Sequence, residues 1–92
     1  SDFRPPHLVG ENGKVEQCLV SNGTVILGEV SHSILSVDSY IGEGAVVGKR
    51  PEDVENKDDW GIAVVGEDCI IKPGAVVAPK EMIDAEQNNK EA

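Results

Sequence analysis

Aliphatic residues recur every six positions in two blocks of the chain, residues 41–47 (IGEGAVV) and 65–77 (VGEDCIIKPGAVV). The residues in this spacing are Ile41, Val47, Val65, Ile71 and Val77. Small residues follow three of them at a distance of four positions, namely Ala45, Cys69 and Ala75. A period of six fits neither an amphipathic helix nor an alternating strand. It is typical of a hexapeptide β-helix, a triangular prism in which three short segments make one coil.

A second repeat, of fifteen residues, precedes these blocks. Residues 15–21 (VEQCLVS) align with residues 30–36 (VSHSILS), and residues 25–26 align in the same way with residues 40–41. Fifteen is short of the roughly 18 residues of a full three-segment coil, so we expect at least one tightened corner. The residues predicted to face inward are Val20, Ile26, Leu35 and Ile41, with Val30 as a partner of Ile26 and with Gly28 and Gly42 at corners.

The pattern predicts an all-β fold, a single-stranded parallel β-helix of about four coils over residues 8–83. Residues 1–7 read as a linker from something larger, because Pro5 and Pro6 cannot donate ladder hydrogen bonds, and residues 84–92 read as a polar tail. Both ends of such a prism expose strand edges that need a cap or a partner. Outward aliphatic residues add an apolar surface suited to oligomer contacts, and they include Val46, Ile70 and Val76.

Residues 48–61 break the pattern. They are mostly polar and acidic, and inward slots at Asp53 and Asp59 would bury unpaired carboxylates. We therefore expect a loop excursion from one corner of the prism, as is common in solenoids. Trp60 is the candidate anchor that folds this loop back onto the coils.

The composition of the chain limits the classes of partner that it is expected to bind. Its 92 residues allow one domain, and a net charge of −9 argues against nucleic acid or an anionic membrane surface. No apolar run approaches the roughly 20 residues that cross a bilayer. The two cysteines, Cys18 and Cys69, are far apart and form no disulfide framework, so a cytoplasmic location is expected.

Catalytic chemistry has few candidates in this sequence. Hexapeptide prisms often belong to trimeric acyltransferases with a histidine as general base, and the histidines here are His7 and His32. The favoured interpretation of His32 is a surface polar residue, while the acyltransferase stays as the alternative function. The acidic loop lacks the spacing of an EF-hand, the cysteines lack a CxxC companion, and no glycine-rich phosphate cradle is present. We therefore assign no catalytic, cofactor-binding or metal-binding residue.

Three cations lie near the second hexapeptide block and could contact a phosphate-bearing effector, although a solvated surface is the simpler interpretation. They are Lys49, Arg50 and Lys72.

The order of these segments resembles a known family. Residues 21–26 contain a serine, then a turn, then an aliphatic pair. Residues 33–36 follow with the pattern Ser-aliphatic-aliphatic-Ser, and the hexapeptide block comes next at residues 40–47. Together with residues 61–77, this arrangement is similar to the C-terminal β-helix domain of glucose-1-phosphate adenylyltransferase, also called ADP-glucose pyrophosphorylase. The resemblance covers residues 5–82, and it implies a left-handed coil.

The resemblance also implies a role. The family joins ATP and glucose 1-phosphate into ADP-glucose and pyrophosphate, with magnesium, in glycogen or starch synthesis. Catalysis belongs to an N-terminal domain that this chain lacks, so the fragment alone is expected to be non-catalytic, without cofactors, and to contact that domain. The β-helix domain helps to assemble a homotetramer and shapes a regulatory pocket. Plant-type members carry an activator lysine where this chain has Asp59, so no regulatory residue is transferred.

Overall fold

The chain folds into very short strands, as expected for segments with one inward aliphatic residue each. The computed structural model describes residues 7–56, 58 and 60–84, and within them every strand pairing is parallel. The strands in these residues are β1 (His7–Val9), β2 (Lys14–Glu16), β3 (Leu19–Val20), β4 (Thr24–Ile26), β5 (Glu29–Ser31), β6 (Ser33–Leu35), β7 (Tyr40–Ile41), β8 (Val46–Val47), β9 (Ala63–Val65), β10 (Ile70–Ile71), β11 (Val76–Val77) and β12 (Met82–Ile83).

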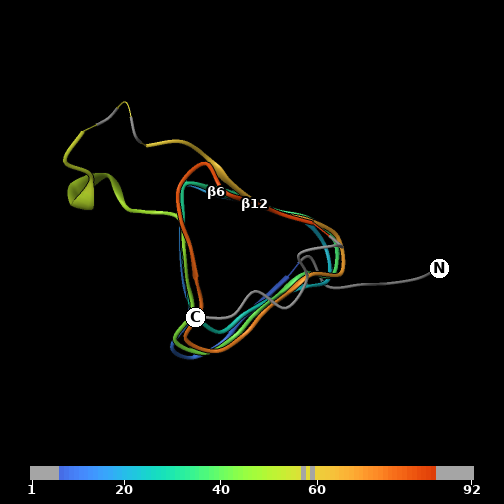
Figure 1. Ribbon diagram of the computed structural model, residues 1–92. Coiled ribbons are helices and arrows are strands. Elements are labelled where there is room, and N and C mark those ends of the chain that lie inside the picture. The colour runs from blue at the N-terminus through green and yellow to red at the C-terminus, as the bar shows by residue number, and fades with distance from the viewer. Residues whose placement is uncertain (1–6, 57, 59, 85–92) are drawn as a thin grey trace.

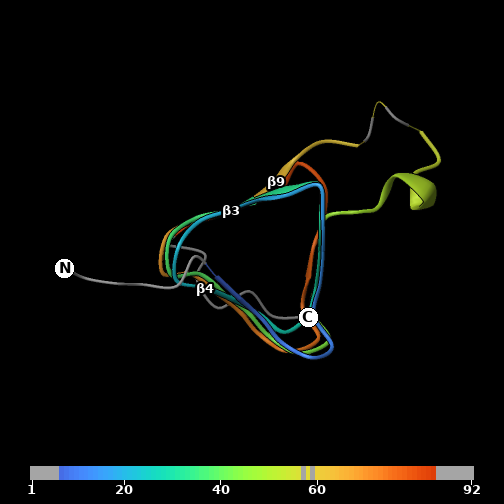
Figure 2. The ribbon, with the colours of Figure 1, turned by 180° about the vertical axis from the view of Figure 1, so that it is seen from behind.

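These strands form three parallel sheets of four strands each. Sheet A has the order β1-β4-β7-β10, sheet B the order β2-β5-β8-β11, and sheet C the order β3-β6-β9-β12. Each coil visits the three sheets in turn, so the chain makes four coils around a triangular cross-section (Figures 1 and 2). In Figure 1 the chain runs clockwise from A through B to C, with the late coils nearer the viewer, which is the left-handed sense. The predicted β-helix is confirmed.

The register places one aliphatic side chain of each strand in a column inside the prism. The columns are Val9, Ile26, Ile41 and Ile71 in sheet A; Val15, Val30, Val47 and Val77 in sheet B; and Val20, Leu35, Val65 and Ile83 in sheet C. From the second coil onward every one of these side chains is buried, with at most 1% of its surface exposed. The predicted small positions, Ala45, Cys69 and Ala75, are buried beside them. The six-residue period therefore does mark the core.

The fifteen-residue repeat corresponds to two coils with a tight corner between sheets B and C. Val15 pairs with Val30, and Leu19 pairs with Ile34, in the predicted alignment. His32 alone separates β5 from β6, and its positive φ of 50° makes the sharp turn. Gln17 begins the same corner in the first coil with a φ of 53°. The expected shortening thus occurs at two corners. One residue is missing at the corner between sheets B and C, and two more are missing at the corner between sheets A and B, where only Leu27 and Gly28 separate β4 from β5.

The outer faces differ in charge. The outward position is apolar in all four coils of sheet A (Leu8, Val25, Tyr40, Ile70) and of sheet C (Leu19, Ile34, Val64, Met82). In sheet B it is Lys14, Glu29, Val46 and Val76. Val46, Ile70 and Val76 are exposed, as the sequence predicted.

Two leucines of sheet C test the inward and outward assignment. Leu35→Ala should lower the free energy of unfolding by about 2–5 kcal/mol, because a fully buried side chain is lost and a cavity remains. Leu19→Ala, the same chemical change at an exposed outward position, should change it by less than about 0.5 kcal/mol. Urea titration followed by circular dichroism measures both. Equal losses in the two variants would contradict the assignment.

Candidate functional site

The third coil contains the excursion that carries the candidate site. β8 ends at Val47 and β9 begins at Ala63, and between them lies the short 3-10 helix η1 (Pro51–Asp53). The segment leaves and re-enters at the corner between sheets B and C, so both sheets continue unbroken past it (Figure 1). At the exit, Gly48 has a φ of 75° and packs so tightly that a Cβ there would overlap the Ser31 carbonyl oxygen.

Trp60 closes the base of the excursion. Its indole Nε1 donates a hydrogen bond of 2.7 Å to the carbonyl oxygen of Lys49, which joins the two ends of the loop. Its ring stacks on His32 of the second coil, with 3.9 Å between centroids and 25° between planes. Trp60 therefore anchors the loop, as the sequence suggested. His32 Nδ1 is buried without a hydrogen-bond partner, so this side chain is more enclosed than the predicted surface residue.

The fourth coil fixes the excursion from the other side. Lys80, at the corner between β11 and β12, donates from Nζ to the carbonyl oxygen of Asp58 over 2.8 Å. Its aliphatic stem covers Gly61 closely enough that a Cβ there would overlap it. Within the loop, Arg50 Nε lies 3.0 Å from Asp53 Oδ2 and 3.7 Å from Glu52 Oε2. The loop is thus held by contacts from the second, third and fourth coils.

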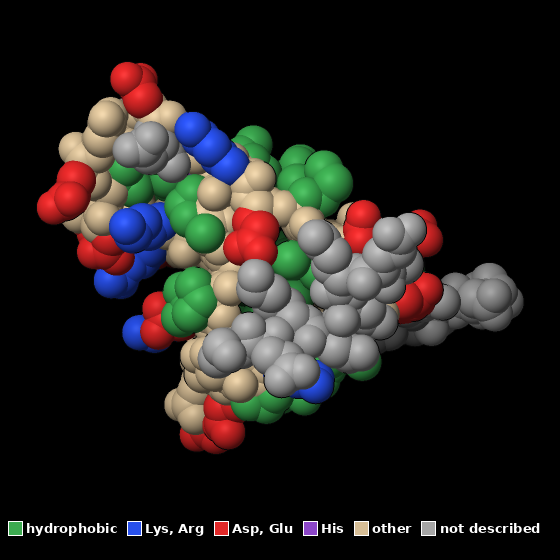
Figure 3. Space-filling model, viewed as in Figure 1, with side chains coloured by type: hydrophobic (Ala, Val, Ile, Leu, Met, Phe, Trp, Pro, Cys, Tyr) green, Lys and Arg blue, Asp and Glu red, His purple; other side chains and the backbone are tan. Residues whose placement is uncertain are grey.

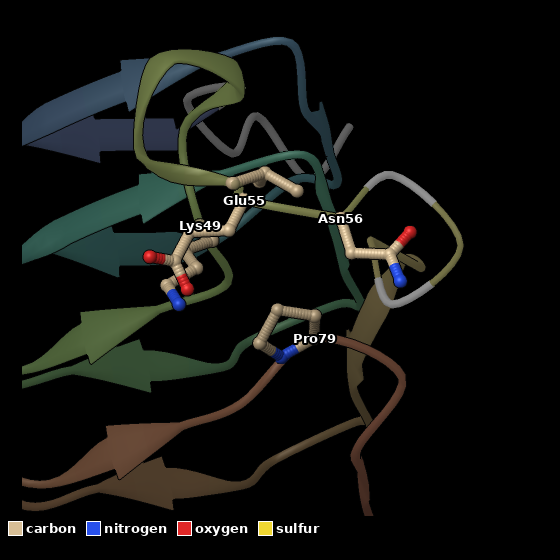
Figure 4. Close-up of a pocket in the computed structure, with 5 residues that line it drawn as sticks. Lys49, Glu55, Asn56 and Pro79 are labelled. Carbon is tan, nitrogen blue, oxygen red and sulfur yellow. The ribbon is translucent and has the colours of Figure 1, made fainter.

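A cavity of about 310 Å³ lies between the excursion and the corner of the fourth coil. It is lined by Lys49, Val54, Glu55, Asn56 and Pro79. Figure 4 shows Pro79, from the coil, on the opposite side of the cavity from the loop residues. The lining thus combines one ammonium group, one carboxylate and one amide with the apolar side chains of Val54 and Pro79. Such a lining suits a small polar molecule that carries an anionic group and hydroxyls.

A second cavity, of about 270 Å³, lies on sheet B beside the same loop base. Its lining is Glu29, Ser31, Val46, Gly48, Lys49, Arg50 and Asp53. Lys49 is therefore shared by both cavities. Most of the Lys and Arg side chains visible in Figure 3 lie on the excursion and beside its base.

The structure separates the three cations that the sequence singled out. Lys49 and Arg50 are neighbours at the loop base, whereas Lys72 lies between β10 and β11, at the corner of sheets A and B. The hydrogen bond to Asp53 raises the pKa of Arg50, so this guanidinium already has an acidic partner. The other cavity residues were missed, because Val54, Glu55 and Asn56 follow no period.

Several sequence-based assignments fall where the structure gives no description. Asp59, residues 1–6 and residues 85–92 lie outside the described residues, as does the side chain of His7. The linker and the polar tail therefore stay predictions.

Within the described part of the chain, no side-chain cluster has the arrangement of a catalytic centre. The face of the His32 ring is covered by Trp60, which gives no support to a general base there. Burial raises the pKa of both the Cys18 and the Cys69 thiol, and this disfavours the reactive thiolate. No group of three or more His, Cys, Asp and Glu residues is placed to bind a metal ion in the described ranges. No helix among these residues is long and apolar enough to cross a membrane.

Comparison with known proteins identifies the relatives of the chain. It is 32% identical over 91 residues to glucose-1-phosphate adenylyltransferase of Bacillus thuringiensis (strain Al Hakam), which corresponds to 87% of this chain and 22% of the relative. The protein of the same name from Bacillus cytotoxicus is 34% identical over 95 residues, with 91% of this chain and 22% of the relative covered. The chain is a homologue of the C-terminal part of glucose-1-phosphate adenylyltransferase.

The predicted resemblance to glucose-1-phosphate adenylyltransferase is thereby confirmed, but it covers only a small part of the length of these relatives. The chain spans about a fifth of the length of these curated relatives. No protein-family model matches the chain, and no solved structure is significantly similar to it.

Because Trp60 is the only tryptophan in the sequence, its fluorescence reports on the contact that anchors the loop. His32→Asn keeps a residue that tolerates the left-handed backbone but removes the stacked ring, so Trp60 should become more accessible to water. We expect a red-shifted emission and stronger acrylamide quenching. Gln17→Asn, at the equivalent corner of the first coil, is the matched control and should leave the emission unchanged. An unchanged spectrum in His32→Asn would contradict the stack.

Proposed function

We propose that this chain is the C-terminal assembly and regulatory domain of a glucose-1-phosphate adenylyltransferase. The full-length enzyme would join ATP and glucose 1-phosphate into ADP-glucose and pyrophosphate for glycogen or starch synthesis. The single observation that carries the proposal is a four-coil prism whose sequence is similar to the C-terminal part of that enzyme.

Catalysis is assigned to a separate N-terminal domain. Nucleotide phosphates are bound by glycine-rich loops or helix N-termini, and the described chain consists of strands, turns and one short 3-10 helix. The linings of the two cavities described above contain no nucleophile paired with a histidine base. ATP and magnesium would therefore bind in the N-terminal domain, and this chain would contribute assembly and regulation.

Lys49 is the proposed effector contact. Its side chain is exposed, it lines both cavities, and its backbone is fixed by the Trp60 hydrogen bond. A phosphate in the larger cavity would meet this ammonium group, while the Asn56 amide could bind a hydroxyl. Arg50 is less suited to bind the phosphate, because its guanidinium already donates a hydrogen bond to Asp53. Lys72, at a different corner, would belong to a separate contact.

Assembly into a homo-oligomer, a tetramer by analogy with the family, is supported by the apolar outer faces of sheets A and C. Contiguous exposed apolar side chains on a small domain mark contact surfaces. Cys18 and Cys69 are free thiols, which fits the proposed cytoplasmic location.

Calorimetry on the 92-residue chain tests the proposal that the substrates bind to the N-terminal domain and not to this one. Titration with ATP and with glucose 1-phosphate should give no binding heat, because the phosphate-binding elements lie elsewhere. The full-length protein should form ADP-glucose from the same two substrates in the presence of magnesium. Tight ATP binding by the isolated chain, or a full-length protein without this activity, would overturn the proposal.

Substitution at the loop base tests the effector contact in the full-length enzyme. With inorganic phosphate as the probe, Lys49→Gln should raise the concentration required for half-maximal regulation by about tenfold, the loss typical of one charged hydrogen bond. Arg50→Gln, at the adjacent position, is the control and should shift it by less than about threefold. A larger effect at Arg50 than at Lys49 would refute the assignment.

A further inference from the structure

Lys80 adopts a backbone conformation that disfavours a lysine. Residues 78–81 form the turn between β11 and β12, which is closed by a hydrogen bond of 3.1 Å from the Glu81 amide to the Ala78 carbonyl oxygen. Pro79 is the second residue of this turn, and Lys80 is the third, with a φ of 72°. Proline in second place and a positive φ in third place are the pattern of a type II turn, whose third position favours glycine or asparagine. A lysine at that position has a conformational cost.

The equivalent turn between β10 and β11 has glycine at this position. It spans residues 72–75, is closed by a hydrogen bond of 3.0 Å from Ala75 to Lys72, and has Pro73 second and Gly74 third, with a φ of 79°. A Cβ at Gly74 would meet nothing within 4 Å beyond its chain neighbours, so only the backbone angle favours glycine there. The four other non-glycine residues with positive φ in the described chain have values of 50–60°, whereas Lys80 lies near the glycine range of 75–79°.

The side chain of Lys80 connects the fourth coil with the excursion. Its Nζ donates a hydrogen bond of 2.8 Å to the Asp58 carbonyl oxygen. The amide of Asp58 in turn donates a hydrogen bond of 3.0 Å to Asn56 Oδ1. The aliphatic stem of Lys80 covers Gly61, where the excursion returns to the prism, so closely that a Cβ on this glycine would overlap it. One side chain therefore contacts the excursion at two places and reaches Asn56 through Asp58.

These contacts lie beside the larger cavity. Pro79, the residue before Lys80 in the turn, forms the coil side of this cavity, and Asn56 belongs to its loop side (Figure 4). Lys80 itself is not among the described residues that line either cavity. A role of Lys80 in this cavity would therefore be exerted through Asp58 and Asn56 and not through direct contact with a ligand.

We infer that Lys80 is a positioning residue of the proposed effector cavity, where it holds the excursion in a fixed position relative to Pro79. The name effector cavity rests on the proposed function, whereas the bracing of the loop does not. The contact with the excursion is the reason why a lysine stands where the turn prefers glycine. The apparent affinity of a ligand is reduced by the fraction of molecules whose site is out of the binding conformation, so a braced loop binds more tightly.

Hydrogen exchange measured by mass spectrometry on the full-length protein tests the bracing. Lys80→Gly suits the turn but removes the contact with Asp58, so peptides that cover residues 54–61 should exchange at least about threefold faster. Peptides that cover β11 and β12, which flank the turn, should exchange no faster, because the conformational cost is relieved. Lys80→Arg keeps a cationic donor on a long side chain and should retain the exchange rates of the unsubstituted protein.

Gly74→Lys is the matched control, because it places a lysine in the turn that has no excursion beside it. It should accelerate exchange of residues 70–77 and leave residues 54–61 unchanged, since only the backbone cost is added.

Regulation by inorganic phosphate connects the bracing with the site. In the full-length enzyme, Lys80→Gly should raise the phosphate concentration required for half-maximal regulation by about threefold, in proportion to the loss of loop protection. Lys80→Arg should leave this concentration unchanged.

The possible results separate the inference from the proposed function. Unchanged loop exchange in Lys80→Gly would overturn the inference, even if phosphate regulates the enzyme. Faster exchange of the loop together with β11 and β12 would show an ordinary structural residue of the turn and would also overturn it. Gly74→Lys without any effect would remove the conformational cost and overturn it as well. Faster exchange confined to the loop, in an enzyme that phosphate does not regulate, would support the bracing while it refutes the proposed effector contact.

Discussion

The parallel stacking of aliphatic side chains in three internal columns is the constraint on which the rest of this structure depends. Each coil places one branched side chain per sheet in register with the equivalent side chain of the previous coil, and from the second coil onward these side chains are buried. A buried Val, Ile or Leu contributes about 1.5–3 kcal/mol, and backbone hydrogen bonds between coils satisfy the polar groups that burial would otherwise leave unpaired. The columns fix the register, because a shift by one residue would turn the aliphatic side chains outward.

The columns also explain how the excursion is tolerated. Residues between Val47 and Ala63 leave the prism at a corner, where no inward side chain is required, and return to the same corner. The contacts that fix the loop come from the neighbouring coils, through His32 below and Lys80 above. The larger cavity exists because the loop stands away from the fourth coil at Pro79. Rigid coils thus position a loop that carries the polar side chains, a common arrangement for binding sites.

The sequence was most informative where the structure is periodic. The six-residue spacing predicted the inward positions from Ile41 onward, and the fifteen-residue repeat predicted a tight corner. The stack between His32 and Trp60 could not be read in the same way, since it joins a corner of one coil to the end of an aperiodic loop in the next. The cavity was missed for the same reason. Lys49 was found only because it is one of few cations, and its separation from Lys72 required the coil geometry.

The two ends of the prism differ in how well the inward side chains are buried. A solenoid buries its core only where a coil or a cap covers the previous one. The inward side chains of the last coil are buried, whereas Val9 in the first coil is 39% exposed. The core is therefore less well covered at the first coil than at the fourth.

Methyl nuclear Overhauser effects in a chain labelled at isoleucine and valine test the column arrangement most directly. The account predicts contacts from Ile26 to Ile41 and from Ile41 to Ile71, in that order, because these pairs are in register in adjacent strands of sheet A. It predicts no direct contact between Ile26 and Ile71, which lie two coils apart. A direct Ile26–Ile71 contact, or the absence of the two predicted contacts, would contradict the stacked β-helix.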